Sequence, residues 1–235
     1  MHKSISIVIP VFNEEEILVG RIRYLHAEMA KLFKEFEIII TENGSKDNTK
    51  NMVRKIASEI PEVIAEIDEG SPDYGQALVN GINRAKFEDV TIFELDFMDM
   101  GFLKASNALL DKYDLIIGSK TIAENMDQRP LKRKIFTMIY NAGLRWAFNV
   151  KLSETHGVKT FKKSKLDYIT NGCVTRNAVW PSEFCIRAVR DKNLEVIEIP
   201  VTIPLVEIRA TRIKAMKRLK KTLDDLMLLR KALAS

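Results

Sequence analysis

Short apolar runs alternate with amphipathic stretches over the first half of the chain, and this order constrains the fold more than any other feature. The runs are 4–10, 37–41, 62–68, 90–95 and 114–119. Segments with helical periodicity lie between them, at 14–36, 46–60, 76–86 and 101–112. Strands that alternate with helices pair in parallel through right-handed crossovers. The sequence therefore predicts an α/β protein with an open, doubly wound, mostly parallel sheet flanked by helices.

The second half of the chain is less regular. Helices are predicted at 131–148 and at 180–192, the latter capped by Ser182, with a turn and short strand within 153–164 and a proline-broken strand at 194–204. Residues 212–235 form a basic amphipathic segment with a stripe of Leu219, Leu223, Leu226 and Leu229. Such a helix either packs on the sheet or lies on a membrane surface, and the stripe serves both purposes.

The composition limits the class of protein. With 235 residues and 46% hydrophobic residues, the chain can bury one large core. Its two cysteines, Cys173 and Cys185, show no metal-like spacing, so we expect neither a disulfide framework nor a zinc site. The N-terminal apolar run is too short for a signal peptide, and no stretch is long enough to span a membrane. We expect a cytoplasmic protein, with peripheral association at the inner membrane face.

Charge divides the chain into two unlike halves. Residues 1–110 carry 12 Lys and Arg against 19 Asp and Glu, whereas residues 111–235 carry 25 against 13. A basic half attracts phosphates, and acids clustered near strand ends attract cations. Nucleic acid is not an expected partner despite the basic pI of about 9.1, because the basic residues lack interleaved aromatics and no recognition motif occurs.

Polar and acidic residues follow four successive predicted strands. They are Asn13 and Glu14, then Glu42, Asn43 and Asp47, then Asp68 and Glu69, then Glu94, Asp96 and Asp99. Ligands of doubly wound sheets bind at the carboxyl ends of the strands, so these residues predict a binding crevice rather than merely solvated strand ends. Alternation along an extended strand predicts that Glu94 and Asp96 point the same way, toward a cation or a sugar nucleotide. Neither a GxGxxG motif nor a P-loop occurs.

An ordered set of motifs resembles the inverting family 2 glycosyltransferases of the GT-A fold, and most of all dolichol-phosphate mannose synthases and other polyprenyl-phosphate glycosyltransferases. The motifs are IVIPVFNEEEIL, IIITENGSKDNT, YGQALVNGI, FELDFMD, DLIIGSK, LKRKI, GVKTF, WPSEFCIRA and IEIPV. The resemblance covers about residues 4–214. It implies one GT-A domain at 1–212, with a nucleotide-binding half at 1–119 and an acceptor-binding half at 120–212, followed by a C-terminal amphipathic helix at 213–235.

The resemblance also implies roles for single residues. Pro10, Phe12 and Glu14 would contact the nucleoside, and Ile40, Glu42, Asn43, Gly44 and Ser45 would surround the base. Glu94, Leu95 and Asp96 stand where the family has Asp-x-Asp, which holds the ribose and, through Mg²⁺ or Mn²⁺ on Glu94 and Asp96, the diphosphate. Lys120, Arg209 and Lys214 would bind phosphates.

Four positions depart from the family's pattern. Glu42 and Glu94 lengthen the side chain by a methylene relative to Asp, so a base or a metal would be held in a shifted position. Asn43 keeps hydrogen-bonding capacity but loses a charge. Met98 replaces a Gln that close relatives use as a further metal contact, and a thioether is a poor ligand for Mg²⁺.

The acceptor implied by the resemblance is a polyprenyl phosphate, which would receive a mannose- or glucose-type sugar from a GDP- or UDP-sugar. A phosphate acceptor needs no general base, and the basic helix entry at Arg129, Lys132, Arg133 and Lys134 would position it, with Arg133 in the catalytic set. A hydroxyl acceptor on a glycan or small molecule would require a base. A third alternative is a sugar-nucleotide-binding protein without turnover. The oligomeric state stays open.

The acid that relatives carry before the GVKTF segment aligns here with Ser153 or Glu154. His156 in the same loop has two interpretations, a catalytic residue or a surface hydrogen-bonder, and the second is the more common. Trp180 and Phe184 could stack on an acceptor, but their helical setting favours the core.

Overall fold

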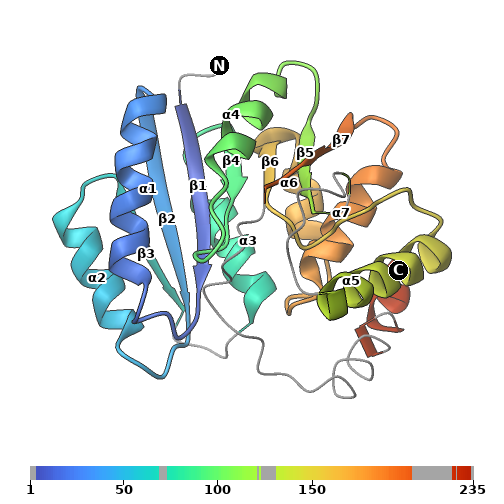
Figure 1. Cartoon of the computed structure of the whole chain (residues 1–235), viewed down its shortest axis with the longest axis horizontal. Helices are drawn as coiled ribbons and strands as arrows, with labels where there is room; N and C mark the ends of the chain where they lie inside the picture. Colours follow the sequence, from blue (N-terminus) through green and yellow to red (C-terminus); the bar gives the residue numbers. More distant parts are fainter. Residues whose placement is uncertain are drawn as a thin grey trace.

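The computed structural model of the protein describes residues 4–68, 73–120, 122, 131–202, 224–225 and 227–233, without the side chains of 68, 131–137, 140 and 141. Within these residues the strands form one sheet in the order β3-β2-β1-β4-β6-β5-β7 (Figure 1). The strands are β1 (Ser4–Val11), β2 (Glu35–Asn43), β3 (Val63–Asp68), β4 (Asp89–Ile92), β5 (Leu115–Ser119), β6 (Lys159–Lys162) and β7 (Val196–Pro200).

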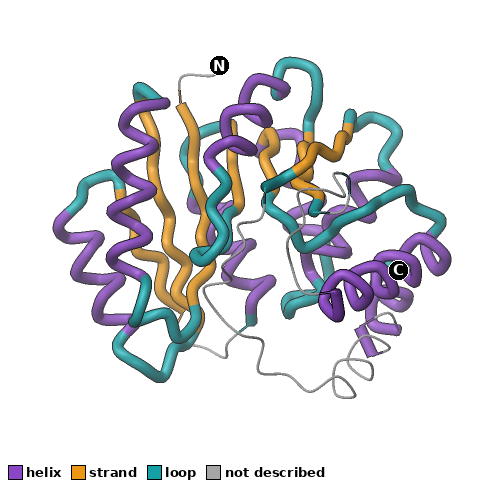
Figure 2. Tube along the Cα trace, viewed as in Figure 1, coloured by secondary structure: helices purple, strands orange, loops and turns teal. Residues whose placement is uncertain are grey.

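Helices cover both faces of this sheet, as Figure 2 shows. They are α1 (Leu18–Leu32), α2 (Thr49–Glu59), α3 (Tyr74–Arg84), α4 (Met100–Leu109), α5 (Leu131–Phe148), α6 (Lys163–Gly172) and α7 (Trp180–Arg190). The predicted α/β class and mostly parallel, doubly wound sheet are confirmed.

One strand runs against the others. Strand β6 pairs antiparallel with both β4 and β5, while the other neighbouring strands are parallel. Because of this reversal, β6 begins where β4 and β5 end, with Lys159 opposite Ile92 and Ile117. The loop that precedes β6 therefore lies at the edge of the sheet where β4 and β5 end.

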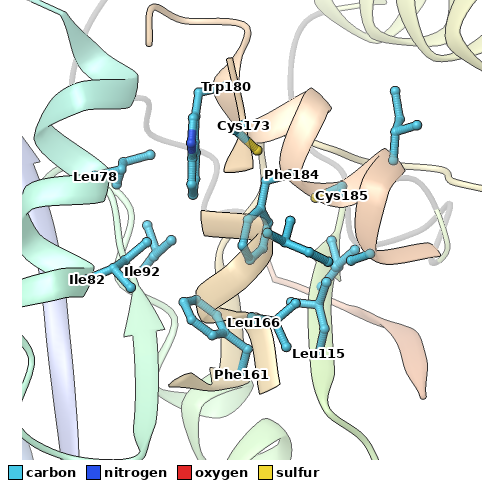
Figure 3. Packing of buried hydrophobic residues seen from close by; sticks show 14 of the residues in the cluster. Leu78, Ile82, Ile92, Leu115, Phe161, Leu166, Cys173, Trp180, Phe184 and Cys185 are labelled. Carbon is cyan, nitrogen blue, oxygen red and sulfur yellow. The ribbon is translucent and has the colours of Figure 1, made fainter. Parts of the chain in front are cut away.

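Two apolar clusters hold the layers together. One packs α1, α2 and α4 against one face of the sheet, and the other packs α3, α6 and α7 against the opposite face. In Figure 3, Leu78 and Ile82 of α3 lie on one side of Trp180 and Phe184. The Trp180 and Phe184 rings are fully buried and stacked, with centroids 4.8 Å apart. The prediction that both rings are core residues is confirmed.

Several predicted boundaries were wrong. Helix α1 ends at Leu32, because Glu35 and Phe36 already pair with β1. Helix α3 begins at Tyr74, two residues before the predicted start at residue 76. Helix α6 was not predicted, because its sequence follows the short β6 without a break. Ser182 does not cap α7: the helix begins earlier, and the Ser182 hydroxyl lies 2.8 Å from the Thr155 hydroxyl.

The described residues between 224 and 233 pack on the apolar cluster that contains α3, α6 and α7. Residues 224–225 and 227–232 are helical, Leu229 is fully buried, and Arg187 of α7 donates a hydrogen bond of 2.8 Å to the Ala232 carbonyl. Leu219, Leu223 and Leu226 lie outside the described residues. None of the described helices is long and apolar enough to cross a membrane.

The first turn of α7 contains a buried acid that ties the helix to the preceding loop. The fully buried Glu183 accepts hydrogen bonds from the Thr175 hydroxyl, the Val174 and Thr175 amides, and Arg187 Nε. Burial opposes ionisation, but these hydrogen bonds outweigh it and lower the pKa of Glu183 below its ordinary value of 4.5. Its contribution to stability is therefore present above about pH 4.5 and is lost as the pH falls through the lowered pKa.

We expect Glu183→Gln to lower the free energy of unfolding by about 3 kcal/mol at pH 7, because it leaves buried donors without an anionic acceptor. The loss should shrink as the pH falls through the lowered pKa of Glu183, because the wild-type side chain then also loses its charge. Urea unfolding across this pH range measures both effects. Glu59→Gln is the control, since its pair with Arg23 is exposed and worth under about 1 kcal/mol. An equal loss in both variants would contradict the assignment.

Candidate active site

The loops after β1 and β2 are fastened to each other and form the rim of the sheet edge. The Asn13 amide donates to Ser45 Oγ at 2.9 Å, and Asn13 Oδ1 accepts from the Lys46 amide at 2.8 Å. The Glu14 amide donates to Thr49 Oγ1 at 2.8 Å. Asn13 has a positive φ of 55°, a conformation that Asn tolerates better than most residues. The rim is thus defined by side-chain to backbone hydrogen bonds.

Two of the predicted base-binding residues brace this rim. Glu42 is fully buried, accepts from the Ser45 amide at 2.5 Å and lies 4.0 Å from Lys50 Nζ. These contacts close the turn at Gly44, whose φ of 69° is in the left-handed region. Asn43 Oδ1 accepts from the Asp73 amide at 2.9 Å, which joins the rim to α3.

The remaining predicted nucleoside contacts differ in exposure. Phe12, at the end of β1, is 40% exposed. Pro10 and Ile40 are buried within β1 and β2, and the Ile40 side chain belongs to the core. The structure therefore leaves the Phe12 ring accessible at the rim, while Ile40 could reach a ligand only through its backbone.

The acids after β4 are arranged by a turn and not by strand alternation. Strand β4 ends at Ile92, and the Phe97 amide donates to the Glu94 carbonyl at 3.0 Å. Glu94 is half-buried and accepts a hydrogen bond from the Tyr74 hydroxyl at the start of α3, whereas Asp96 is exposed. The prediction that the strand extends through Glu94 to residue 95 was therefore wrong, although the Asp96 charge still acts on Glu94.

The surroundings of Tyr74 keep its hydroxyl protonated, so it donates its hydrogen bond to Glu94. Burial, followed by the charge of Glu94, raises the pKa of Tyr74 well above its ordinary value. Desolvation also raises the pKa of Glu94, and the charge of Asp96 adds to this, while the Tyr74 hydrogen bond and the charges of Lys120 and Lys159 oppose it. The pair thus links α3 to the carboxylate at the end of β4.

The residues next to Glu94 and Asp96 in the sequence have structural contacts. Leu95 is buried in the core, and its carbonyl accepts from Arg21 Nε at 2.9 Å. Met98 is also buried in the core, so its thioether does not replace the metal-binding Gln of relatives. Asp99 caps α4 through the Phe102 amide and accepts from the Thr202 amide, both at 2.9 Å.

The residues fit a divalent cation that is shared between the protein and a ligand. In the described part of the chain no group of three or more His, Cys, Asp or Glu could hold a metal alone. Asp96 is exposed, and no described residue donates a hydrogen bond to its carboxylate. Mg²⁺ commonly takes one or two carboxylates and completes its shell with substrate phosphates and water. Asp96, with Glu94 beside it, matches that pattern.

The loop at 153–157 forms the other side of the edge. Glu198 of β7 accepts from the amides of Ser153 and Glu154, at 3.0 and 2.9 Å, and from the Ser153 hydroxyl at 2.9 Å. Burial raises the pKa of Glu198. Glu154 is itself buried and accepts from the amides of Thr155 and His156, so its carboxylate closes the loop on itself.

His156 is engaged at both ring nitrogens. Nε2 lies 3.0 Å from the Ala178 carbonyl, and Nδ1 lies 3.2 Å from the Thr155 hydroxyl. A carbonyl can only accept, so Nε2 carries the proton in this arrangement. Desolvation by the surrounding protein lowers the pKa of His156, although part of the side chain remains exposed. These contacts favour the interpretation of His156 as a hydrogen-bonding residue of the loop over a catalytic role.

Other predicted site residues cannot be placed with their side chains. Glu69, Arg129, Arg209 and Lys214 lie outside the described residues, as do the side chains of Asp68, Lys132, Arg133 and Lys134. Lys120 is described: its ammonium lies 5.4 Å from the centre of the Phe97 ring, in the turn that carries Glu94.

Sequence reasoning missed three residues at this edge. Tyr74, Lys159 and Glu198 come from α3, β6 and β7. Tyr74 and Glu198 lay inside quoted motifs, but their partners are distant in the sequence. A charged residue in the apolar GVKTF strand was the one local signal for Lys159.

Residues 6–169 match the family model described as glycosyl transferase family 2. This match covers more than half of the chain. The chain belongs to glycosyl transferase family 2. The recognised family and the GT-A architecture expected from the motifs are confirmed.

Two curated proteins are similar to parts of this chain. It is 24% identical to glycosyltransferase AglD of Haloferax volcanii over 84% of this chain and 32% of that protein. It is 34% identical to an undecaprenyl-phosphate 4-deoxy-4-formamido-L-arabinose transferase of Pseudomonas fluorescens over 40% of this chain and 28% of that protein. The chain thus spans about a third of these relatives' length.

The fold likeness extends over nearly the whole chain. Glucosyl-3-phosphoglycerate synthase of Mycobacterium tuberculosis, solved with Mn²⁺, UDP and glucosyl-3-phosphoglycerate, superposes with a TM-score of 0.60 and 18% identity. The match covers 98% of this chain and 80% of the synthase. It shows a common GT-A fold.

Proposed function

We propose that this family 2 protein transfers a mannose- or glucose-type sugar, with inversion, from a nucleotide-diphosphate sugar to a polyprenyl phosphate. The observation that carries the proposal is the turn at 94–97, which presents an exposed Asp96 beside the Tyr74-bound Glu94 at the carboxyl edge of the sheet. A cation on these acids, supplied as Mg²⁺ or Mn²⁺, would neutralise the charge of the leaving diphosphate. The solved relative with Mn²⁺ and UDP supports this part of the proposal.

The donor half of the site is assigned to residues 1–119. Phe12 is the exposed ring available to the base, and Lys120, which directly follows this half and β5, supplies a cation for phosphate whose charge also acts on Glu94. Arg209 and Lys214 remain proposed phosphate contacts. A GDP- or a UDP-sugar is compatible with these features, because the rim fixes its own backbone and offers few base-specific side chains.

The acceptor side favours an anion over a hydroxyl. Both described acids at this side of the edge already accept hydrogen bonds: Glu154 accepts from its own loop, and Glu198 of β7 accepts from Ser153 and Glu154. A phosphate acceptor is already ionised near neutral pH and requires no base. The basic entry to α5, with Arg133 and Lys134, would position this phosphate. The undecaprenyl-phosphate relative supports this choice.

Helix α5 supports an association with the membrane surface, where such an acceptor resides. Leu144 and Phe148 are buried against the domain, while Met138, Ile139 and Trp146 are 61%, 56% and 90% exposed. Isolated exposed apolar residues are ordinary, but three on one helix in the basic half of the chain form an interfacial pattern. Trp146 is of the residue type that prefers the membrane interface.

The experiment incubates the protein with GDP- and UDP-sugars, with and without Mn²⁺, and then adds a short polyprenyl phosphate. We expect metal-dependent formation of an organic-extractable sugar phosphate lipid. Transfer to a glycan hydroxyl instead would support the hydroxyl-acceptor alternative. Nucleotide-sugar binding without turnover on any acceptor would support a binding protein.

A variant separates the two acceptor chemistries. Glu198→Gln should retain at least about a tenth of kcat with the lipid phosphate, because no proton is removed from the acceptor. A general base in this position would instead contribute about 10²- to 10⁴-fold, and its loss would appear in kcat and in the pH profile. Ser153→Ala is the matched control, since it removes the hydroxyl that donates to Glu198 and leaves the carboxylate.

A further inference from the structure

Lys159 is a lysine buried inside the sheet, at the edge that carries the candidate site. It is only 2% exposed and begins β6, opposite Ile92 of β4 and Ile117 of β5. Strand alternation places its side chain on the same face as Phe161, which packs beneath α3 and α7. Since β4 reaches Glu94 two residues after Ile92, the Lys159 ammonium lies just inside the binding edge.

The ammonium has few partners for its three donors. Nζ donates to the Gly157 carbonyl at 2.7 Å, two residues earlier in the chain. Among the described residues no carboxylate lies within 4.0 Å of Nζ, whereas the next lysine of the same strand, Lys162, pairs with Asp114 at 3.6 Å. Burying a charge without a contacting counter-charge is costly, so such a group is retained only where the structure uses it.

Gly157, whose carbonyl accepts this hydrogen bond, lies where the 153–157 loop passes very close to the backbone of β5. A Cβ on Gly157 would lie 2.1 Å from the Gly118 carbonyl oxygen of β5. The Gly118 amide donates to the Val158 carbonyl at 2.8 Å. The hydrogen bond from Lys159 therefore fixes the peptide at which the 153–157 loop joins the sheet.

The charge of Lys159 also reaches groups on several elements. It acts on Glu94 after β4, on His156 in the loop and on Cys185 in α7. The groups that act on His156 include Glu154 and the Thr155 hydroxyl from its own loop, Lys159 from β6, Lys120 directly after β5, and the Ala178 carbonyl. His156 is thus a natural reporter of the Lys159 charge.

We propose that Lys159 is a positioning residue: its buried ammonium holds the 153–157 loop against the sheet and gives the binding edge a fixed positive charge that favours anionic substrates. Since Lys159 is enclosed, it acts through the Gly157 peptide and through its field rather than by touching the substrate. The inference rests on the proposed function for its kinetic consequence alone; the charge and the loop contact are tested without substrate.

The first test is an NMR titration of His156 in wild type, Lys159→Met and Lys162→Met. Methionine keeps the length of the lysine stem without its charge. A neighbouring cation lowers the pKa of a histidine, so Lys159→Met should raise the pKa of His156 toward its ordinary value of 6.5. Lys162→Met, at the far end of β6, should leave it unchanged. If the pKa of His156 is unchanged in a folded Lys159→Met variant, Lys159 does not place a positive charge on this edge.

The second test is kinetic. Lys159→Met should lower kcat for sugar transfer about 30-fold with less than a threefold change in donor KM, and Lys159→Arg should recover part of the loss. Lys162→Met should retain wild-type kcat. Wild-type kcat in Lys159→Met, or no recovery in a folded Lys159→Arg, would refute the positioning role. If the wild type transfers no sugar, the proposed function fails, while the His156 titration still decides whether Lys159 acts on this edge.

Discussion

Asp96→Ala should abolish metal-linked nucleotide binding and lower sugar transfer at least about 10³-fold. Asp96 is the exposed carboxylate of the 94–97 turn, and Glu94 beside it already accepts from Tyr74. Without Asp96, the remaining carboxylate ligand for a cation would be Glu94, which is half-buried and already accepts a hydrogen bond from Tyr74. A metal that neutralises a leaving diphosphate supplies several kcal/mol, and each 1.4 kcal/mol corresponds to about a factor of ten.

Calorimetric titration of UDP and GDP with and without Mn²⁺ measures the binding effect. Wild type should bind about 100-fold more tightly with Mn²⁺, whereas Asp96→Ala should bind equally with metal and with a chelator. Glu35→Ala removes an exposed acid at the opposite end of β2 and should behave as wild type. Unchanged metal-dependent affinity in Asp96→Ala would remove this carboxylate from the site.

Gly157→Ala should be the most damaging small substitution at the edge. The added Cβ would lie 2.1 Å from the Gly118 carbonyl oxygen, and both partners are backbone, so neither can rotate away. The 153–157 loop must therefore leave the sheet, which also displaces the carbonyl bound by Lys159. We expect a loss of about 3 kcal/mol in unfolding free energy and about a 100-fold loss in kcat.

Thermal unfolding checks the stability effect, with a fall in Tm of about 6 to 12 °C for a chain of this length. Gly20→Ala is the matched control, because a Cβ on Gly20 meets no atom within 4 Å and Gly20 lies inside α1. Alanine there should raise stability by about 0.5 to 1 kcal/mol. A Gly157→Ala variant as stable and active as wild type would contradict the close approach of Gly157 to the Gly118 carbonyl oxygen.

The sheet was predictable because its strands carry their own signal. Runs such as 4–10 and 114–119 are apolar and β-branched, and the polar residues that follow parallel strands must meet at one edge. Exposed Asp96 and the rim at Asn13 were therefore accessible to sequence reasoning. The same reasoning missed the antiparallel entry of β6, since a short strand carries no mark of its direction.

The site contacts that the sequence did not predict join segments that are distant along the chain. Tyr74 touches Glu94, and Glu198 holds Ser153, across 20 and 45 residues of sequence. Glu42 and Asn43 matched base-binding positions by motif, yet Glu42 Oε1 and Asn43 Oδ1 already accept hydrogen bonds from the Ser45 and Asp73 amides. A motif gives the position of a residue along the chain, whereas tertiary hydrogen bonds decide which atoms stay available to a ligand.

Sugar transfer to a lipid phosphate is measured directly by following labelled sugar from a nucleotide sugar into polyprenyl phosphate in the organic phase. We expect a labelled lipid that forms with Mn²⁺ or Mg²⁺, disappears with a chelator and is reduced at least about 10³-fold by Asp96→Ala. Label found only on a hydroxyl acceptor, or no labelled product although the nucleotide sugar binds, would contradict it.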